Sequence, residues 1–321
     1  MGDWLLLRGE EAVTNAVWRT LAHDGHVRAF TQLPQFNYIC LRELAWQAMC
    51  LVRVSPPTVV PMVLRKRRGG LAVRVESLAY GLAGGPITGY APDERAVREI
   101  ARALARCALE VFVYPSRGTF APHGWDRIDF AAHEVPLESP HKVWSQASRS
   151  CRGAARHAQR CGVHVVEVAE GPWVEAITVL HEQQQRARKA RRYSLGWISS
   201  ILREMPDHTG LWAAIHDGRP VAALLVGWCK TAAVALLSTG DPGARPLKAG
   251  NLLYLTVLEE LARRGMSTLD LGGSRSLPAL EAFKRSLGGV SSARPFYLHR
   301  HPGLSLYQRV VGNTPGLTAG D

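Results

Sequence analysis

The order of helix and strand patterns in the second half of the chain constrains its fold more than any other feature. A helix that ends at Gly162 is followed by a strand, a long helix, three consecutive strands, and then a helix, a strand, a helix and a closing strand. These elements are expected over residues 143–160, 163–168, 173–192, 211–215, 220–228, 232–238, 249–264, 268–271, 277–287 and 294–299. The order predicts a mixed α/β domain.

A shorter series of the same kind precedes this domain. We expect a helix, two β-rich runs joined by a turn, a helix with Asp93 as its N-cap, and a buried strand, over residues 10–21, 58–64, 67–70 (the turn), 71–75, 93–109 and 110–114. The stretch from Pro115 to Pro140 is rich in turn residues and carries one extended segment, Ala131–Leu137. The sequence therefore predicts domains over residues 1–135 and 136–305 and a C-terminal tail over 306–321.

Positive charge is clustered along the chain. The formal net charge is +12, and ten Lys or Arg stand against four acids between His141 and Arg192. Such clustering indicates a polyanionic partner. No apolar stretch approaches the ~20 residues that span a bilayer and the N-terminus lacks a secretion signal, so we expect a cytoplasmic protein without stable membrane insertion. The Cys residues show no zinc-ribbon or disulfide pattern, and the His pairs that are spaced as ligands could be have no evident partner pair, so we expect no metal.

Several motifs, taken in order, resemble a known family. They are residues 78–86 (LAYGLAGGP), Ser148-Arg149 through 160–163 (RCGV), 269–273 (LDLGG) and 282–289 (AFKRSLGG). The second domain resembles the GNAT acyltransferase fold, and a degenerate copy is expected before it. Two tandem copies resemble the FemABX family of aminoacyl-tRNA-dependent peptidyl transferases. The helical arm that some members insert into the second domain is missing from the short loop between Arg186 and Trp197.

A basic stripe is expected on the helix over residues 143–160. At 100° per residue, four arginines fall within about 80° of one helix face; they are Arg149, Arg152, Arg156 and Arg160. The stripe could bind the phosphates of tRNA or of a substrate. The alternative is a solvated helix face, although four arginines without interspersed acids repel one another there.

Two further basic segments follow. By the resemblance to FemABX proteins, Arg188, Arg192 and Tyr193 are expected to contact an acceptor substrate, although cations are also favoured at any helix C-terminus. Arg245 and Lys248 open the helix after the three antiparallel strands. In acetyltransferases of this fold that junction binds the pyrophosphate of coenzyme A, and in the aminoacyl-tRNA enzymes it faces the acceptor end of tRNA.

The pair Phe283-Lys284 is the sharpest local signal. Only 6 of the 39 basic residues are Lys, and a Lys ammonium is a compact charge that suits a developing oxyanion. The family's Phe-Lys pair lies at the acyl-donor end, so Phe283 and Lys284 are predicted to be catalytic, although Lys284 could merely extend from an amphipathic helix to solvent. Asp270, before Gly272 and Gly273, is a candidate substrate-binding residue or a turn residue. No general base is assigned.

These patterns favour an aminoacyltransferase. It would use aminoacyl-tRNA as co-substrate, without a further cofactor, and form an amide on an amine of a peptide-like or peptidyl-nucleotide acceptor, such as a peptidyl antibiotic or a peptidoglycan precursor. The alternative is an acyl-CoA-dependent N-acyltransferase of the same fold. A third interpretation is an RNA-binding protein without activity, against which the Phe283-Lys284 pair argues.

Overall fold

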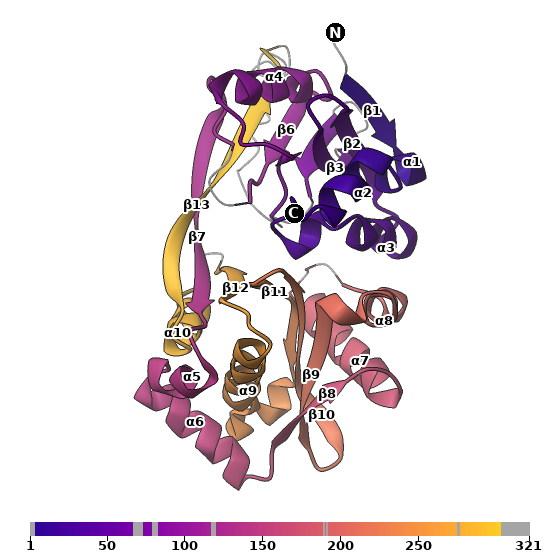
Figure 1. Ribbon diagram of the computed structural model, residues 1–321. Coiled ribbons are helices and arrows are strands. Elements are labelled where there is room, and N and C mark those ends of the chain that lie inside the picture. The colour runs from indigo at the N-terminus through magenta and orange to yellow at the C-terminus, as the bar shows by residue number, and fades with distance from the viewer. Residues whose placement is uncertain are drawn as a thin grey trace, which may run out of the picture. The chain divides into compact units, whose positions relative to one another are not determined.

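The computed structural model describes residues 4–66, 73–78, 83–116, 120–188, 190, 192–274 and 277–302 (Figure 1). The chain divides into two compact units. Unit 1 comprises residues 1–130 together with 294–321, and unit 2 comprises residues 131–293. The fold is mixed α/β in both units, as the sequence predicts.

Unit 1 is built on a mixed sheet in the strand order β1-β2-β3-β4-β6-β13. Its strands are β1 (Trp4–Arg8), β2 (Gln47–Arg53), β3 (Thr58–Lys66), β4 (Val73–Ser77), β6 (Glu110–Val113) and the last part of β13 (Val290–Arg300), while the short β5 (Ile87–Thr88) pairs with β3. β4 and β6 are parallel, and the other pairs are antiparallel.

Helices cover both faces of this sheet. They are α1 (Gly9–Val13), α2 (Ala16–His23), α3 (Pro34–Leu44) and α4 (Glu94–Ala105). On β2, Met49 and Leu51 share a buried cluster with Ile100 of α4, whereas the Cys50 thiol donates to the Ala12 carbonyl of α1. Because neighbouring strand residues point to opposite faces, α4 and α1 lie on opposite sides of the sheet.

Unit 2 has the strand order β7-β12-β11-β10-β9-β8. The strands are β7 (Asp126–Pro136), β12 (Thr268–Gly273), β11 (Ala232–Gly240), β10 (Arg219–Cys229), β9 (Thr209–His216) and β8 (His164–Val168). Among these described strands, β11 and β12 form the one parallel pair. The three predicted central strands are therefore confirmed as antiparallel neighbours.

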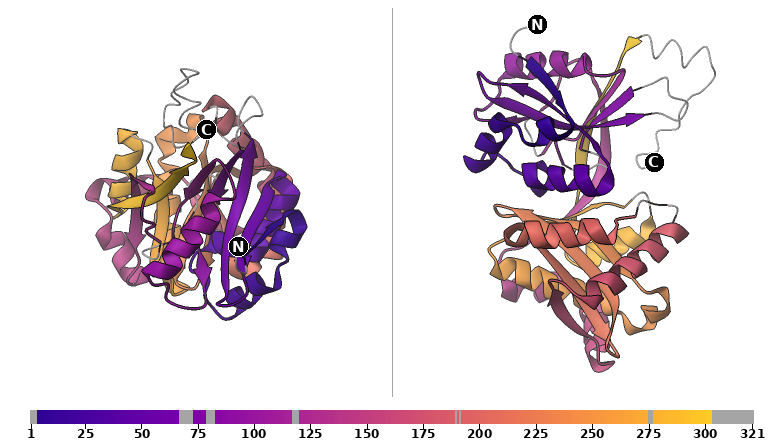
Figure 2. Two further views of the ribbon diagram at one scale, coloured as in Figure 1. Left: turned by 90° about the horizontal axis from the view of Figure 1, so that it is seen from above. Right: turned by 90° about the vertical axis from the view of Figure 1, so that its right-hand side faces the viewer.

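Two groups of helices cover the sheet of unit 2. α5 (Pro140–Gln146), α6 (Arg149–Arg160) and α9 (Ala249–Arg263) share one buried cluster with Trp212, Leu224 and Val226. α7 (Pro172–Ala187) and α8 (Leu195–Glu204) lie on the other side (Figure 1), the side turned to the viewer in the right-hand view of Figure 2. α10 (Pro278–Ser286) follows β12.

Some predicted elements differ in their limits for local reasons. The helix expected over 143–160 is two helices, because Ala147 has extended dihedrals and the Ser148 hydroxyl accepts from the Cys151 N–H as the cap of α6. The helix expected over 10–21 is likewise divided at Asn15, which caps α2. Asp93 caps α4 as predicted. The sequence did not predict α3, α8, β1 or β2, and the turn at 67–70 and the tail over 306–321 lie outside the described residues.

The closing strand joins a different unit from the one expected. Residues 294–299 are predicted to end the second domain, yet Tyr297–Arg300 pair with β6 of unit 1. Phe296 contacts Phe112 and Tyr114 there, with ring centroids 6.1 and 5.2 Å away. The first unit-2 residue is Ala131, close to the predicted boundary at 135.

Candidate active site

A gap between two parallel strands marks the candidate active site of unit 2. β11 and β12 pair only at Ala232–Thr268, Ala233–Leu269 and Val234–Asp270. Beyond these positions β11 continues to Gly240, bonded to β10 on its other side, and β12 continues to Gly273. Within the described strands, the edge of β11 past Val234 therefore faces β12 without pairing to it. An extended acyl or peptide group can bind such an edge by backbone hydrogen bonds.

The end of β12 has an irregular backbone that Asp270 shapes. Its Oδ1 accepts from the Gly272 N–H at 2.7 Å, and the pairing with β7 shifts register between Asp270 and Gly272. Gly272 has φ +66°, a conformation that favours glycine. These contacts support the turn role for Asp270 that the sequence left open beside substrate binding.

Lys284 lies over this irregular strand end. Its Nζ donates to the carbonyl of Gly272 at 2.9 Å and to that of Gly273 at 2.8 Å, and the residue is only 6% exposed. Burial lowers the pKa of the ammonium from 10.5 to about 8, and the nearby Asp270 carboxylate partly offsets that effect. Lys284 is therefore not a solvated helix residue. An ammonium has three N–H bonds, so one remains for a ligand after the two carbonyls are bound.

Phe283 holds the helix that carries Lys284. Its ring meets that of Tyr254 on α9 edge to face, with centroids 5.3 Å apart. Burial raises the pKa of Tyr254, whose hydroxyl bonds to Ser238 on the unpaired stretch of β11. α10 ends where the Gly289 N–H bonds to the Lys284 carbonyl, and a Cβ on Gly289 would lie 2.5 Å from that oxygen. Phe283 thus positions Lys284, and glycine is required at 289.

His133 of β7 completes a buried polar cluster that the sequence did not reveal. It lies opposite Gly272 in the sheet and is fully buried, and its Nδ1 is 3.4 Å from the Ser274 hydroxyl. Burial and the Lys284 charge lower the pKa of His133 and so favour its neutral form. Its Nε2 has no hydrogen-bond partner among the described residues. Only the sheet register brings His133 to the strand end, so no local sequence pattern could have found it.

The predicted basic stripe forms on α6 with three free cations. Cys151, Ala155 and Ala158 face the core, and Arg149, Arg156 and Arg160 are exposed. These three arginines make no ion pair with any described residue. Arg152 is different, because its guanidinium donates to the carbonyls of Trp144, Ser145 and Ala147 at the end of α5.

The basic segments at α9 and α7 lie on different faces. Arg245 and Lys248 are exposed in the connection from β11 to α9, and the Asn251 amide donates to the Cys151 thiol at 3.4 Å. That contact joins the first turns of α9 and α6, so Lys248 and Arg149 share one end of the two helices.

Arg188 and Arg192 are exposed beyond the end of α7, on the other side of the sheet. The Tyr193 ring, just before α8, is enclosed by two other rings. Tyr193 stacks on His181 at 5.6 Å and on Trp197 at 4.1 Å, so both of its faces are covered. The Tyr193 N–H donates to His181 Nε2, and burial lowers the pKa of His181 to about 4. Tyr193 can therefore offer a ligand only its edge and hydroxyl.

The structure thus gathers Phe283, Lys284 and Asp270 at one strand end, joined by His133 and Ser274. No group of three His, Cys, Asp or Glu side chains in the described ranges could hold a metal ion. None of the described helices is long and apolar enough to cross a membrane.

Comparisons with known proteins agree with this architecture. Residues 145–285 match the family model described as Acetyltransferase (GNAT) domain. No curated protein matches the sequence significantly. Among solved structures, FemX aligns with a TM-score of 0.69 at 12% identity, covering 96% of this chain and 99% of that one.

Two other solved structures span nearly the whole chain. The C-terminal domain of a putative lysylphosphatidylglycerol synthetase from Agrobacterium fabrum aligns with a TM-score of 0.64 at 14% identity, covering 97% of this chain and 100% of that one. A tandem GNAT protein from the clavulanic acid biosynthesis pathway aligns with a TM-score of 0.52 at 16% identity, covering 92% and 98%. The predicted resemblance is therefore confirmed at the level of fold: the chain has a FemABX-like tandem GNAT fold, and residues 145–285 of its second unit match the GNAT domain model.

Proposed function

We propose that this protein transfers an aminoacyl group from aminoacyl-tRNA to an amine of a peptide-like acceptor and so forms an amide. The observation that carries the proposal is the buried Lys284 ammonium, held by two carbonyls at the gap between β11 and β12. A GNAT domain and the fold similarity to FemX support acyl transfer of this kind.

The chemistry proceeds by direct attack. The acceptor amine nitrogen forms a bond to the ester carbonyl carbon, whose oxygen becomes an oxyanion. When the tetrahedral intermediate collapses, the bond from carbon to the ribose oxygen breaks, the amine loses a proton and the ribose oxygen gains one. The third N–H of Lys284 would stabilise the oxyanion, a type of contact worth about 3–4 kcal/mol in other enzymes. Because the pKa of Lys284 is about 8, its side chain is mostly charged at pH 7.

The exposed arginines of α6 would hold the tRNA. Arg149, Arg156 and Arg160 are unpaired within the described structure, and Lys248 lies beside the Arg149 end. Each phosphate that such residues neutralise releases counterions and strengthens binding. The acceptor would then approach past Arg188 and Arg192. A peptidoglycan precursor or a peptidyl antibiotic would be a suitable acceptor.

The alternative donor is acyl-CoA. The acetyltransferase family model favours it, because that model covers both the gap and the start of α9. Against it, the segment Arg245–Asn251 at the start of α9 carries a single glycine, Gly250, and Lys248 there adopts a left-handed conformation with φ +56°.

The donor can be identified by following label into product. Purified protein is incubated with a low-molecular-weight cell extract as the source of amine acceptors and with either ¹⁴C-aminoacyl-tRNA or ¹⁴C-acetyl-CoA. We expect labelled amide only from the tRNA donor, and ribonuclease pretreatment should abolish it. Product that survives ribonuclease and requires acetyl-CoA would replace this proposal with the alternative.

A further inference from the structure

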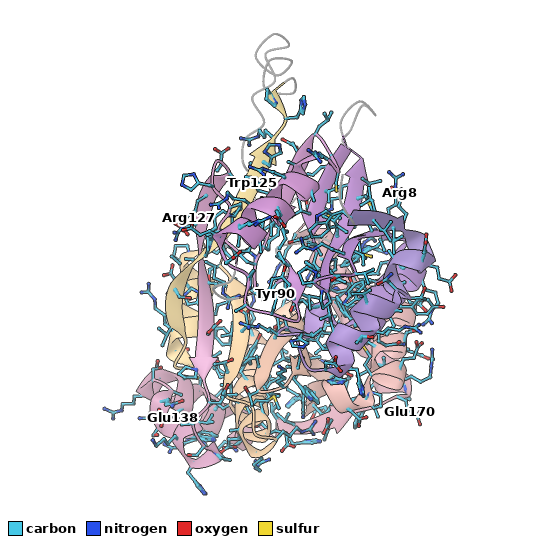
Figure 3. The ribbon with its side chains drawn as sticks, turned by 45° about the horizontal axis from the view of Figure 1, so that its top comes forward. Arg8, Tyr90, Trp125, Arg127, Glu138 and Glu170 are labelled. Atoms are coloured by element: carbon cyan, nitrogen blue, oxygen red, sulfur yellow. The ribbon has the colours of Figure 1, made fainter. Side chains whose placement is uncertain are left out.

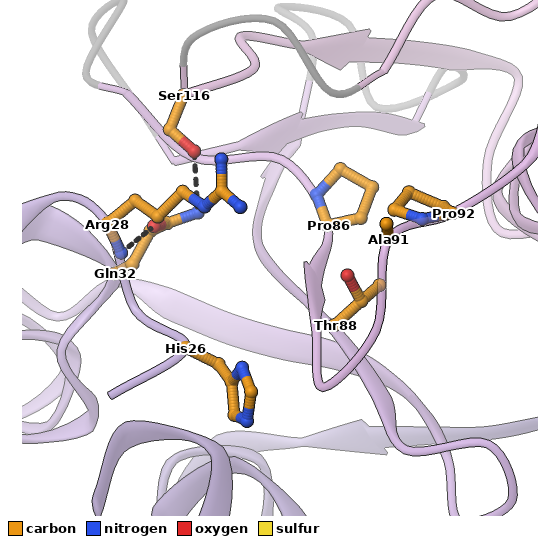
Figure 4. A pocket seen from close by; sticks show the side chains of 8 residues that line it. All are labelled: His26, Arg28, Gln32, Pro86, Thr88, Ala91, Pro92 and Ser116. Atoms are coloured by element: carbon orange, nitrogen blue, oxygen red, sulfur yellow. Dashed lines mark hydrogen bonds between the residues drawn. The ribbon is translucent and has the colours of Figure 1, made fainter. Parts of the chain in front are cut away.

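Unit 1 contains a pocket that the proposed reaction does not use. It has a volume of about 200 Å³. Figure 4 shows the lining residues, which are His26, Arg28, Gln32, Pro86, Thr88, Ala91, Pro92 and Ser116. One side is polar and basic and the opposite side is largely apolar.

The polar side is built around Gln32, which is 1% exposed. Its Oε1 accepts from the backbone N–H groups of Arg28 and Ala29 at 3.1 and 3.2 Å. Its Nε2 donates to the Gly84 carbonyl at 2.8 Å and to the Ser116 hydroxyl at 3.4 Å. A buried side chain that satisfies four groups in three segments fixes the backbone around it. The Arg28 backbone is therefore held in place before any ligand arrives.

The apolar side is anchored to the sheet. β5 pairs with β3, and the Tyr90 hydroxyl (labelled in Figure 3) accepts from the Arg53 guanidinium at 2.8 Å. A Cβ on Gly89 would lie 3.3 Å from both Leu21 and Pro57, so this segment packs closely on its neighbours. Pro86 and Pro92 are consequently presented by a fixed segment.

The charge of the pocket has one sign. His26 and Arg28 are the ionisable residues in the described lining, and no acidic residue lines it. The Arg28 side chain forms no ion pair within the described part of the chain, and Figure 4 shows its guanidinium turned toward the pocket, across from Pro86. A guanidinium is a planar fork of N–H donors that matches carboxylate and phosphate oxygens.

We propose that this pocket binds a small organic anion. Its carboxylate or phosphate group would bind Arg28, and a compact apolar body would pack against Pro86 and Pro92. The observations behind this proposal all come from unit 1.

Isothermal titration of the full-length protein tests this proposal with four probes: benzoate, phenyl phosphate, inorganic phosphate and benzamide. Benzamide matches benzoate in shape but has no charge, and inorganic phosphate lacks the apolar body. We expect benzoate or phenyl phosphate to bind at least about tenfold more tightly than benzamide and inorganic phosphate. The preferred probe distinguishes a carboxylate from a phosphate ligand.

Arg28→Gln should weaken that binding by at least about tenfold. The fold should persist, because Gln32 binds the Arg28 backbone and not its side chain. The matched control is Arg19→Gln, which removes the same charge from an exposed site on α2 and should leave binding unchanged. The proposal is overturned if no probe binds the wild type at about 10 mM, if benzamide or inorganic phosphate binds as tightly as the better of benzoate and phenyl phosphate, or if both variants lose affinity equally.

Discussion

Replacing Lys284 with Met should change how stability depends on pH. The folded-state pKa of Lys284 is about 8 against 10.5 for a free lysine. Below pH 8 both states carry the proton, and the folded state bears the full cost of a buried charge. Between pH 8 and 10.5 the folded state releases the proton first, so the unfolded state binds more protons and the stability of the wild type rises. The difference between these two pKa values corresponds to about 3 kcal/mol of stability.

Urea unfolding of the wild type and Lys284→Met from pH 7 to 10.5 measures this effect. Subtracting the two free energies of unfolding removes every group that titrates alike in both proteins. The wild type should gain up to about 3 kcal/mol relative to the variant across that range. Arg285→Met is the control, because Arg285 is exposed and pairs with Glu281. A difference that stays flat with pH would refute the burial of the ammonium.

Three further predictions concern the surrounding structure. The double variant Arg149→Ala and Arg156→Ala should lower the slope of log affinity for tRNA against log salt by about one to two units, with little loss of stability. Arg152→Ala should instead destabilise the fold by about 1–3 kcal/mol, because three carbonyls at the end of α5 lose their donor. An unchanged salt slope in the double variant would contradict the phosphate-binding role. Gly289→Ala should destabilise unit 2 in thermal unfolding, because its Cβ would meet the Lys284 carbonyl. Gly153→Ala should stabilise the unit by about 0.5–1 kcal/mol, because a Cβ at that position of α6 meets no other atom. Equal effects of the two variants would contradict the close contact between residue 289 and the Lys284 carbonyl. Because His181 has a folded-state pKa near 4, stability should fall as the pH drops from 6.5 to 4, and His181→Phe should remove that fall; a fall that persists in the variant would place its cause elsewhere.

Local patterns in the sequence were sufficient for most elements of unit 2. The 3.6-residue period placed four arginines on one face of α6, and strand alternation with the turn at 216–219 predicted the hairpin of β9 and β10. The rarity of Lys and the Phe-Lys pair singled out Lys284. Each of these signals depends on residues that lie close together in the chain.

Long-range pairing accounts for what the sequence did not reveal. His133 joins Ser274 and Lys284 only because β7 pairs with β12. β13 has an ordinary strand pattern, which cannot say that its last residues pair with β6 of the other unit. The sequence predicts Arg152 to be one more exposed cation of the stripe. In the structure its guanidinium instead binds carbonyls at the break between α5 and α6, including that of Ala147.

Single-turnover transfer with saturating donor and acceptor tests the central claim most directly. Lys284→Ala should lower the transfer rate by about 10²–10³, with the affinities for tRNA and acceptor little changed. Lys284→Arg should also be slow, because a planar fork cannot occupy the position of a compact ammonium between the Gly272 and Gly273 carbonyls. Arg285→Ala should keep most of the activity, since its side chain lies on the exposed face of α10. A folded Lys284→Ala variant that transfers at nearly the wild-type rate would contradict the account.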